Sequence, residues 1–231
     1  MRDVDMDVAH SERRALIGPN GAGKTTLFNV IAGDLPATSG RITLFGKDVT
    51  HMPVHKRVML GLRRTYQTSA LFNALTVAEN LYLGVAGPGK GHFNVVRLAS
   101  RDKEYMVRVH EIAGVVGLTD RLSTAAGHLS HGEQRQLEFG LAIAREPRIV
   151  MLDEPAAGLS PDERKVVVKL LNGLSREITL LLIEHDMDVA LSVAERVTVL
   201  HEGRVIAEGS PTDITSNTQV QRVYLGGKLH D

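Results

Sequence analysis

The sequence predicts an α/β fold in which a helical segment interrupts a core of strands and helices. Three observations lead to this prediction. Short apolar runs of strand length recur along the chain, and two of them are followed by segments with helical periodicity. Between residues 66 and 145 strand-like runs are missing and helical periodicity dominates. The 231 residues are enough for one such domain with a hydrophobic core.

The N-terminal part of the chain contains a strand, a glycine-rich turn and a helix, in that order. The apolar residues 15–17 predict the strand, and the periodicity of Lys24–Ala32 predicts the helix, which Gly33 ends. Residues 41–45 alternate polar and apolar side chains, which predicts a further strand closed by a turn.

The C-terminal part of the chain continues the alternation of strands and helices. Buried strands are predicted at residues 149–152 and at Thr179–Ile183, each followed by acidic residues. Residues 162–174 carry their apolar side chains on one side of a helix. Residues 197–200 and 204–207 flank a Glu-Gly pair and predict a hairpin.

The segment between the two parts predicts helices only. They are expected at residues 77–85, 105–116 and 134–144. We therefore predict one domain over residues 1–231. Residues 1–66 and 146–231 form its core, and residues 67–145 form a helical subdomain.

The composition excludes several classes of function. Lys plus Arg and Asp plus Glu are both 27, so the chain lacks the basic excess of a dedicated nucleic-acid binder. It has no cysteine and hence no disulfide, thiolate zinc site or cysteine nucleophile. No apolar stretch approaches the roughly 20 residues of a membrane-spanning helix, and the first residues are too charged for a signal peptide. We expect a cytoplasmic chain that would work at a membrane only by docking to another protein.

The glycine-rich turn is the strongest chemical signal. Residues 18–25, GPNGAGKT, match the phosphate-binding pattern G-x-x-x-x-G-K-[ST] in its required place between a strand and a helix. Backbone N–H groups and the helix N-terminus can bind phosphate oxygens, Lys24 can reach the β- and γ-phosphates, and the Thr25 hydroxyl can bind Mg²⁺. The predicted nucleotide-binding residues are Gly18, Pro19, Asn20, Gly21, Ala22, Gly23, Lys24, Thr25 and Thr26.

Two acids follow the apolar strand 149–152. This arrangement is that of the second phosphate-site motif, Walker B, in which Asp153 would hold Mg²⁺. Glu154 could act as the general base that activates the attacking water. The alternative is a strand that ends in a solvated acidic turn.

Residues 129–134, LSHGEQ, resemble the signature sequence LSGGQ of the ABC ATPases. Ser130 and Gly132 occupy matching positions, whereas His131 replaces a glycine and Glu133 a glutamine. The resemblance implies that Ser130, Gly132 and Glu133 face the γ-phosphate of a nucleotide bound by a second subunit, so that the active form is a dimer. Taken alone, the segment would be read as an ordinary helix N-cap.

Other parts of the chain resemble the same family in the same order. Gln67 matches the Q-loop glutamine, which contacts Mg²⁺ and the attacking water, and His185 matches the switch histidine, which contacts the γ-phosphate. Residues 157–160 correspond to the D-loop, with Ser160 in place of the usual aspartate. Because the whole set occurs in order across nearly the whole chain, the chain is identified as a member of the ABC ATPase family.

Several short stretches of sequence resemble one particular group within the ABC ATPase family. RTYQ at residues 64–67, DEPAAGL at 153–159 and LLIEHDM at 181–187 are similar to the importers of branched-chain amino acids. RVYLG at 222–226 is similar to that group and to the lipopolysaccharide-export ATPase. The implied fold is a P-loop NTPase (RecA-like) core with an inserted helical subdomain and an antiparallel β subdomain, of ABC ATPase type.

The implied function is ATP hydrolysis, with ATP and Mg²⁺, that powers amino-acid import. The implied partners are a second ATPase subunit, a transmembrane permease and, indirectly, a solute-binding protein, at the inner face of the membrane and without nucleic acid. A lipopolysaccharide-type exporter or a non-transport ABC ATPase remains the alternative. The family also carries an aromatic residue that stacks on adenine, and none precedes Gly18. The sequence does not indicate what replaces it, which solute is carried, or whether the dimer is homo- or heteromeric.

Overall fold

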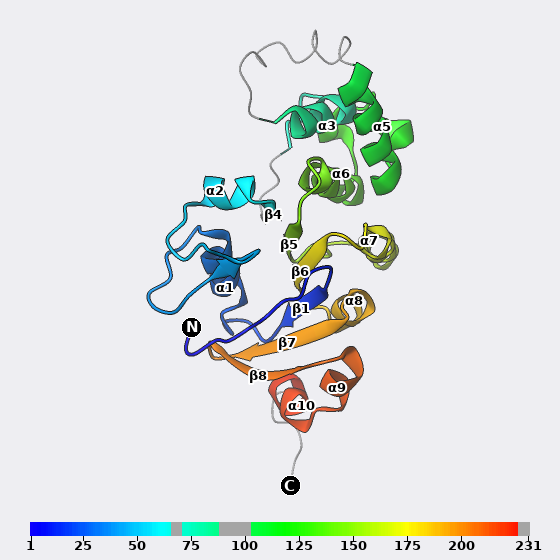
Figure 1. The fold of residues 1–231 in the computed structure, drawn as a ribbon. Coiled ribbons are helices and arrows are strands. Elements are labelled where there is room, and N and C mark those ends of the chain that lie inside the picture. The colour runs from blue at the N-terminus through cyan, green and yellow to red at the C-terminus, as the bar shows by residue number, and fades with distance from the viewer. Residues whose placement is uncertain (66–70, 88–102, 226–231) are drawn as a thin grey trace. The chain divides into compact units, whose positions relative to one another are not determined.

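A computed structural model describes residues 1–65, 71–87 and 103–225 of the chain (Figure 1). The chain divides into two compact units. The first, which we call the sheet unit, consists of Met1–Arg64, Arg148–Ala156 and Arg176–Asp231. The second, the helical unit, consists of Thr65–Pro147 and Ala157–Ser175.

A six-stranded sheet forms the centre of the sheet unit, with the strand order β4-β5-β6-β1-β7-β8. Its neighbours pair in parallel except for β8, which is antiparallel to β7. The bounds are β4 (Leu62–Arg64), β5 (Ile149–Asp153), β6 (Thr179–Ile183), β1 (Arg13–Ile17), β7 (Arg196–His201) and β8 (Arg204–Gly209). Strands β1, β5 and β6 are buried along their whole length, which explains the apolar runs at residues 15–17, 149–152 and 180–183.

Helices and a small hairpin complete the sheet unit. Helix α1 (Lys24–Ala32) follows β1, and α8 (Met187–Val193) follows β6. At the edge of the sheet, α9 (Pro211–Ser216) and α10 (Thr218–Leu225) pack on β8 (Figure 1). The remaining elements are α2 (Val54–Met59) and a two-stranded antiparallel sheet of β2 (Thr43–Leu44) and β3 (Lys47–Asp48).

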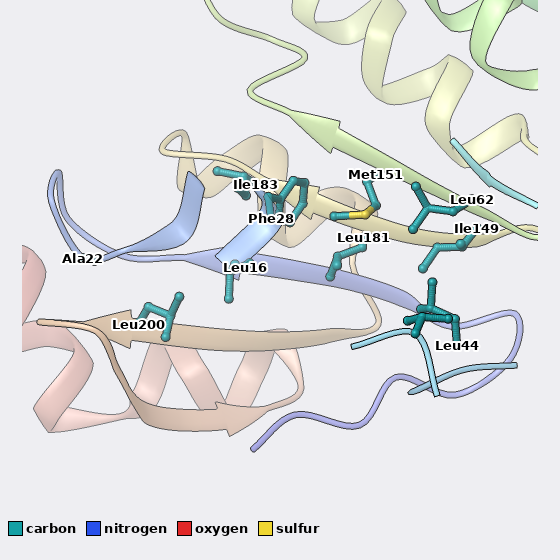
Figure 2. Packing of buried hydrophobic residues seen from close by; sticks show 11 residues of the cluster. Leu16, Ala22, Phe28, Leu44, Leu62, Ile149, Met151, Leu181, Ile183 and Leu200 are labelled. Atoms are coloured by element: carbon teal, nitrogen blue, oxygen red, sulfur yellow. The ribbon is translucent and has the colours of Figure 1, made fainter. Parts of the chain in front are cut away.

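The core of the sheet unit anchors the glycine-rich turn. Figure 2 shows that Phe28 of α1 and Ala22 of the turn belong to one buried cluster with Leu16, Met151 and Ile183 of the central strands. Burying a side chain as large as phenylalanine contributes roughly 1.5–3 kcal/mol. Because Phe28 is fully buried, helix α1, which follows the glycine-rich turn, is held against the central strands.

The helical unit contains α3 (Val77–Ala86), α5 (Lys103–Val116), α6 (His131–Ile143) and α7 (Pro161–Gly173). Two glycines let α3 and α6 approach closely. A Cβ on Gly140 of α6 would lie 2.8 Å from Leu81 Cδ2, and one on Gly84 of α3 would lie 2.9 Å from Leu141 Cδ2. None of the described helices combines the length and the apolar composition that a bilayer crossing requires.

The structure confirms the predicted α/β class, the hairpin, which β7 and β8 form, and helix α1. The strand expected at residues 41–45 is shorter, since β2 covers only Thr43–Leu44. The unit boundary also differs from the predicted subdomain 67–145, because Ala157–Ser175 groups with the helical unit. Helix α7 packs on α5 there, and an amphipathic pattern shows that a helix has a buried face without showing which neighbour covers it.

Candidate functional site

The glycine-rich turn, residues 18–23, presents a helix N-terminus that can accept an anion. Gly23 is the N-cap of α1 at φ 103°, a left-handed conformation that glycine adopts without strain. Among the described residues, no side chain caps this helix and its first turn contains no acid. Its first N–H groups and its dipole are therefore available to phosphate oxygens.

Position 18 requires glycine because the backbone of β7 lies very close to it. A Cβ at this position would lie 2.2 Å from the carbonyl oxygen of Leu200 on β7. Only glycine fits, which explains the first glycine of the motif. Gly18 and Ala22 are buried, Pro19 and Gly23 are half-buried, and Asn20, Gly21, Thr25 and Thr26 are exposed.

Lys24 folds back over the turn that precedes it. Its Nζ donates to the carbonyl oxygens of Gly18, at 2.6 Å, and Pro19, at 3.1 Å. Burial lowers the pKa of Lys24, and the nearby charges of Glu154 and Asp153 oppose this effect. The ammonium group thus lies at the centre of the turn and within electrostatic range of both predicted acids.

Asp153 is the last residue of β5. Its carboxylate is buried, and within the part of the chain that the structure describes only one of its two oxygens accepts a hydrogen bond. Its Oδ2 accepts from Arg64 Nη2 at 3.1 Å, while Oδ1 has no hydrogen-bond partner among the described residues. Burial raises the pKa of Asp153, and the hydrogen bond and charge of Arg64 oppose that shift. A buried carboxylate oxygen without a partner is costly, so this atom fits a cation.

Glu154 and His185 come together because β5 and β6 are adjacent and parallel. The register pairs Asp153 with Ile183, so the residues after both strands emerge at the same edge. The Glu154 N–H donates to the Ile183 carbonyl at 2.9 Å, and Glu154 Oε2 lies 3.6 Å from His185 Nδ1. Glu154 has φ 50°, a left-handed conformation that is strained for a glutamate and that clusters at functional sites.

The signature-like turn begins α6 in the helical unit. Ser130 is the N-cap and forms a reciprocal capping box with Glu133. Glu133 Oε1 also accepts from Arg121 Nε at 2.8 Å, and these bonds, that from the Ser130 amide first, lower the pKa of Glu133. Both carboxylate oxygens of Glu133 are therefore engaged within the chain.

Gly132 donates its N–H to Glu163, which was not among the predicted site residues. The acceptor is Glu163 Oε1, at 3.1 Å, in the first turn of α7. Glu163 also forms a capping box with Ser160, and hydrogen bonds from Ser160 and Gly132 lower its pKa. The S-x-x-E spacing signals the cap in the sequence, but nothing in the spacing signals the bond to Gly132.

The predicted site residues fall into two groups, one in each unit. The sheet unit brings together the glycine-rich turn, Asp153, Glu154 and His185, and the helical unit holds Ser130, Gly132 and Glu133. Gln67 lies outside the described residues. Arg64 and Glu184, which contact this site, were not selected from the sequence because their roles depend on partners far along the chain.

Comparisons with known proteins agree with this geometry. The family model described as ABC transporter matches residues 1–157, and the model described as branched-chain amino acid ATP-binding cassette transporter matches residues 204–230. Branched-chain amino acid transport ATP-binding protein BraF of Pseudomonas aeruginosa is 37% identical over 96% of this chain and 90% of its own length. LivG of Escherichia coli strain K12, of the same description, is 35% identical over 98% and 91%.

Other relatives show the breadth of the family. Lipopolysaccharide export system ATP-binding protein LptB of Acidithiobacillus ferridurans is 35% identical over 99% of this chain and 91% of its own length. Among solved structures, the ADP conformation of MJ1267, an ATP-binding cassette of an ABC transporter, superposes with a TM-score of 0.83 at 31% identity. That match covers 96% of this chain and 91% of the other. This chain therefore belongs to the ABC transporter family as a nucleotide-binding, ATP-hydrolysing subunit homologous to the ATPases of branched-chain amino acid transporters.

Proposed function

We propose that this ATPase powers the import of branched-chain amino acids through a separate transmembrane permease. The similarity to BraF and LivG, which are branched-chain amino acid transport ATP-binding proteins, supports this cargo, as does the family model matched by residues 204–230. The observation that carries the hydrolytic part is that Glu154 meets His185 at one sheet edge and lies within electrostatic range of Lys24.

The proposed nucleotide site needs two copies of the ATPase. One copy binds the triphosphate through residues 18–26, where Lys24 exchanges its bonds to the Gly18 and Pro19 carbonyls for phosphate oxygens. Ser130, Gly132 and Glu133 of the second copy face the γ-phosphate. Gly132 already binds a carboxylate oxygen of Glu163, which supports its ability to bind an anionic oxygen.

The proposed chemical step is attack of water on the γ-phosphorus of ATP. Glu154 accepts a proton from the water as the new P–O bond forms and the bond to the ADP oxygen breaks. Lys24 and His185 stabilise the charge on the transferred phosphoryl group. The half-exposed side chain of Glu154 can reach a water at this edge of the sheet, whereas Asp153 is buried.

The oxygen atoms at this edge fit a magnesium ion. Asp153 Oδ1 is buried without a hydrogen-bond partner among the described residues, and Mg²⁺ in proteins is bound by one or two carboxylates together with substrate phosphates and water. The described residues contain no group of three His, Cys, Asp or Glu that would hold a metal without substrate. Asp153, Thr25 and Gln67 would hold the ion, which would neutralise charge on the phosphates.

The proposed partners follow from the family. They are a second ATPase subunit, the permease and, indirectly, a solute-binding protein, with the ATPase on the cytoplasmic face of the membrane and without nucleic acid. Export of lipopolysaccharide is the second candidate, because LptB matches at 35% identity over 99% of the chain.

Uptake of radiolabelled leucine tests the proposal. Deletion of the gene should abolish high-affinity uptake, and the wild-type chain should restore it. Glu154→Gln, which keeps the size of the side chain and removes its basicity, should still bind ATP but lower hydrolysis by about a hundredfold or more. Uptake that survives deletion, together with loss of lipopolysaccharide from the cell surface, would favour the second candidate. Near-normal hydrolysis by Glu154→Gln would refute the base assignment.

A further inference from the structure

Glu184 is a fully buried carboxylate that the proposed mechanism does not use. It lies directly after β6, between the strand and His185, and its side chain has no solvent exposure. Burial raises its pKa, and backbone amides, that of Ala156 first, oppose the shift. Burying a carboxylate opposes folding unless hydrogen bonds compensate, so its contacts indicate what it does.

One oxygen of Glu184 fixes the turn that carries Glu154. The Ala156 N–H donates to Glu184 Oε1 at 2.9 Å, and the Glu154 N–H donates to the Ile183 carbonyl at 2.9 Å. These two bonds tie the turn after β5 to the end of β6 on either side of Pro155. They hold Glu154 in its strained left-handed conformation.

The other oxygen of Glu184 faces the ring of His185. Glu184 Oε2 has no hydrogen-bond partner among the described residues and lies 3.9 Å from His185 Nδ1. Glu154 Oε2 lies 3.6 Å from the same nitrogen. Both distances are longer than a hydrogen bond, so the two carboxylates act on Nδ1 through their charge, which favours an N–H at this nitrogen.

We propose that Glu184 is a positioning residue for ATP hydrolysis, which holds the Glu154 turn with one oxygen and orients the His185 imidazole with the other. The inference rests on the proposed roles of Glu154 and His185 at the γ-phosphate. Because the two carboxylate charges attract the Nδ1–H edge of the ring, they favour the orientation in which the Nε2 edge is directed away from them. Glu184 thus couples two side chains that come from different strands.

Two substitutions separate the contacts of Glu184. Glu184→Gln keeps an oxygen for the Ala156 N–H and replaces the acceptor near His185 by an amide. Glu184→Met, of similar length, removes both contacts without burying an unpaired oxygen. We expect kcat to fall roughly tenfold in the first variant and further in the second, with KM for ATP within about twofold of wild type, because the contacts act on the chemical step.

Glu12→Gln is the matched control. Glu12 is also largely buried in the sheet unit, accepts the Ala9 N–H at 2.9 Å with one oxygen and pairs with Arg14 through the other. It lies outside the site, so Glu12→Gln should lower stability without changing kcat. Thermal unfolding of every variant separates loss of fold from loss of function.

The tautomer of His185 provides a readout that does not depend on activity. In spectra of protein labelled with ¹⁵N-histidine, with His185 assigned from a His185→Gln variant, the His185 ring should carry a proton on Nδ1 in the wild type. Glu184→Gln should lower the population of rings that carry a proton on Nδ1, whereas Glu12→Gln should not. An unchanged tautomer together with wild-type kcat in folded Glu184→Gln would overturn the proposal. If Glu154→Gln stayed active while Glu184→Gln shifted the tautomer, the role of Glu154 would fail but the orientation of His185 by Glu184 would stand.

Discussion

At the scale of single residues, the site depends on side chains that bind different partners through different polar atoms. Arg64 pairs with Asp153 at 3.1 Å and, through its other terminal nitrogen, with Asp34 at 2.8 Å and Asn29 at 2.6 Å. Its guanidinium lies 5.8 Å from the centre of the Phe28 ring. Arg64 therefore links the end of β5 to helix α1, which begins at the glycine-rich turn. The planar fork of arginine suits such a junction, since lysine offers a single point of attachment.

Arg64→Met should destabilise the fold strongly. The substitution leaves Asp153 buried without its cation, and removing one partner of a buried pair costs about 3–5 kcal/mol. Arg176→Met is the control, because Arg176 pairs with Glu195 on the surface and such pairs contribute about 1 kcal/mol or less. Urea denaturation followed by circular dichroism measures both. Equal losses in the two variants would show that Asp153 does not depend on Arg64.

At the scale of elements, the signature-like turn and α7 form one arrangement within the helical unit. Gly132 lies in the first turn of α6, and a Cβ there would come 2.7 Å from Glu163 Oε1 and 3.0 Å from Glu163 Cγ. The first turn of α7 therefore occupies the space in front of Gly132. Glycine at this position permits the bond between its N–H and the carboxylate.

Gly132→Ala should displace Glu163 and break this bond. We expect a loss of roughly 1 kcal/mol in stability, the net value of one charged hydrogen bond less the gain in helix propensity, and a marked fall in ATP hydrolysis. Gly173→Ala in α7 is the control, because a Cβ there meets no atom within 4 Å. It should be neutral or slightly stabilising. A Gly132→Ala variant as stable and active as Gly173→Ala would show that the bond is dispensable.

The same elements show what the sequence could predict. Helix α1 and strands β5 and β6 were predictable because apolar periodicity and the glycine-rich turn are local signals. The grouping of α7 with α5 was not predictable from the sequence. Nor were three hydrogen bonds between residues far apart in the chain. They join Gly132 to Glu163 (31 residues apart), Arg64 to Asp153 (89 residues apart) and Ala156 to Glu184 (28 residues apart). Such pairs depend on which helices and strands become neighbours, and no local pattern encodes that arrangement.

At the scale of the whole molecule, the two groups of site residues raise the question of how a complete site forms. The residues proposed to bind the phosphates and activate water lie in the sheet unit, and those of the signature-like turn lie in the helical unit. If two copies associate head to tail, each complete site takes Lys24 from one copy and Ser130 from the other. The arrangement can be tested without knowing the cargo.

Mixing two inactive variants tests whether the Lys24 and the Ser130 of one complete site come from different copies of the chain. Lys24→Ala removes the phosphate-binding ammonium, and Ser130→Phe blocks the signature-like turn. In a mixed dimer one site carries both substitutions and the other carries neither, because Lys24 and Ser130 of one site come from different copies. An equal mixture forms mixed dimers in about half of cases, so about a quarter of wild-type hydrolysis should return. Each variant alone should stay inactive, and folding and ATP binding by Ser130→Phe serve as controls. Activity that never returns, although the variants demonstrably exchange subunits, would mean that Lys24 and Ser130 do not meet across two copies of this chain.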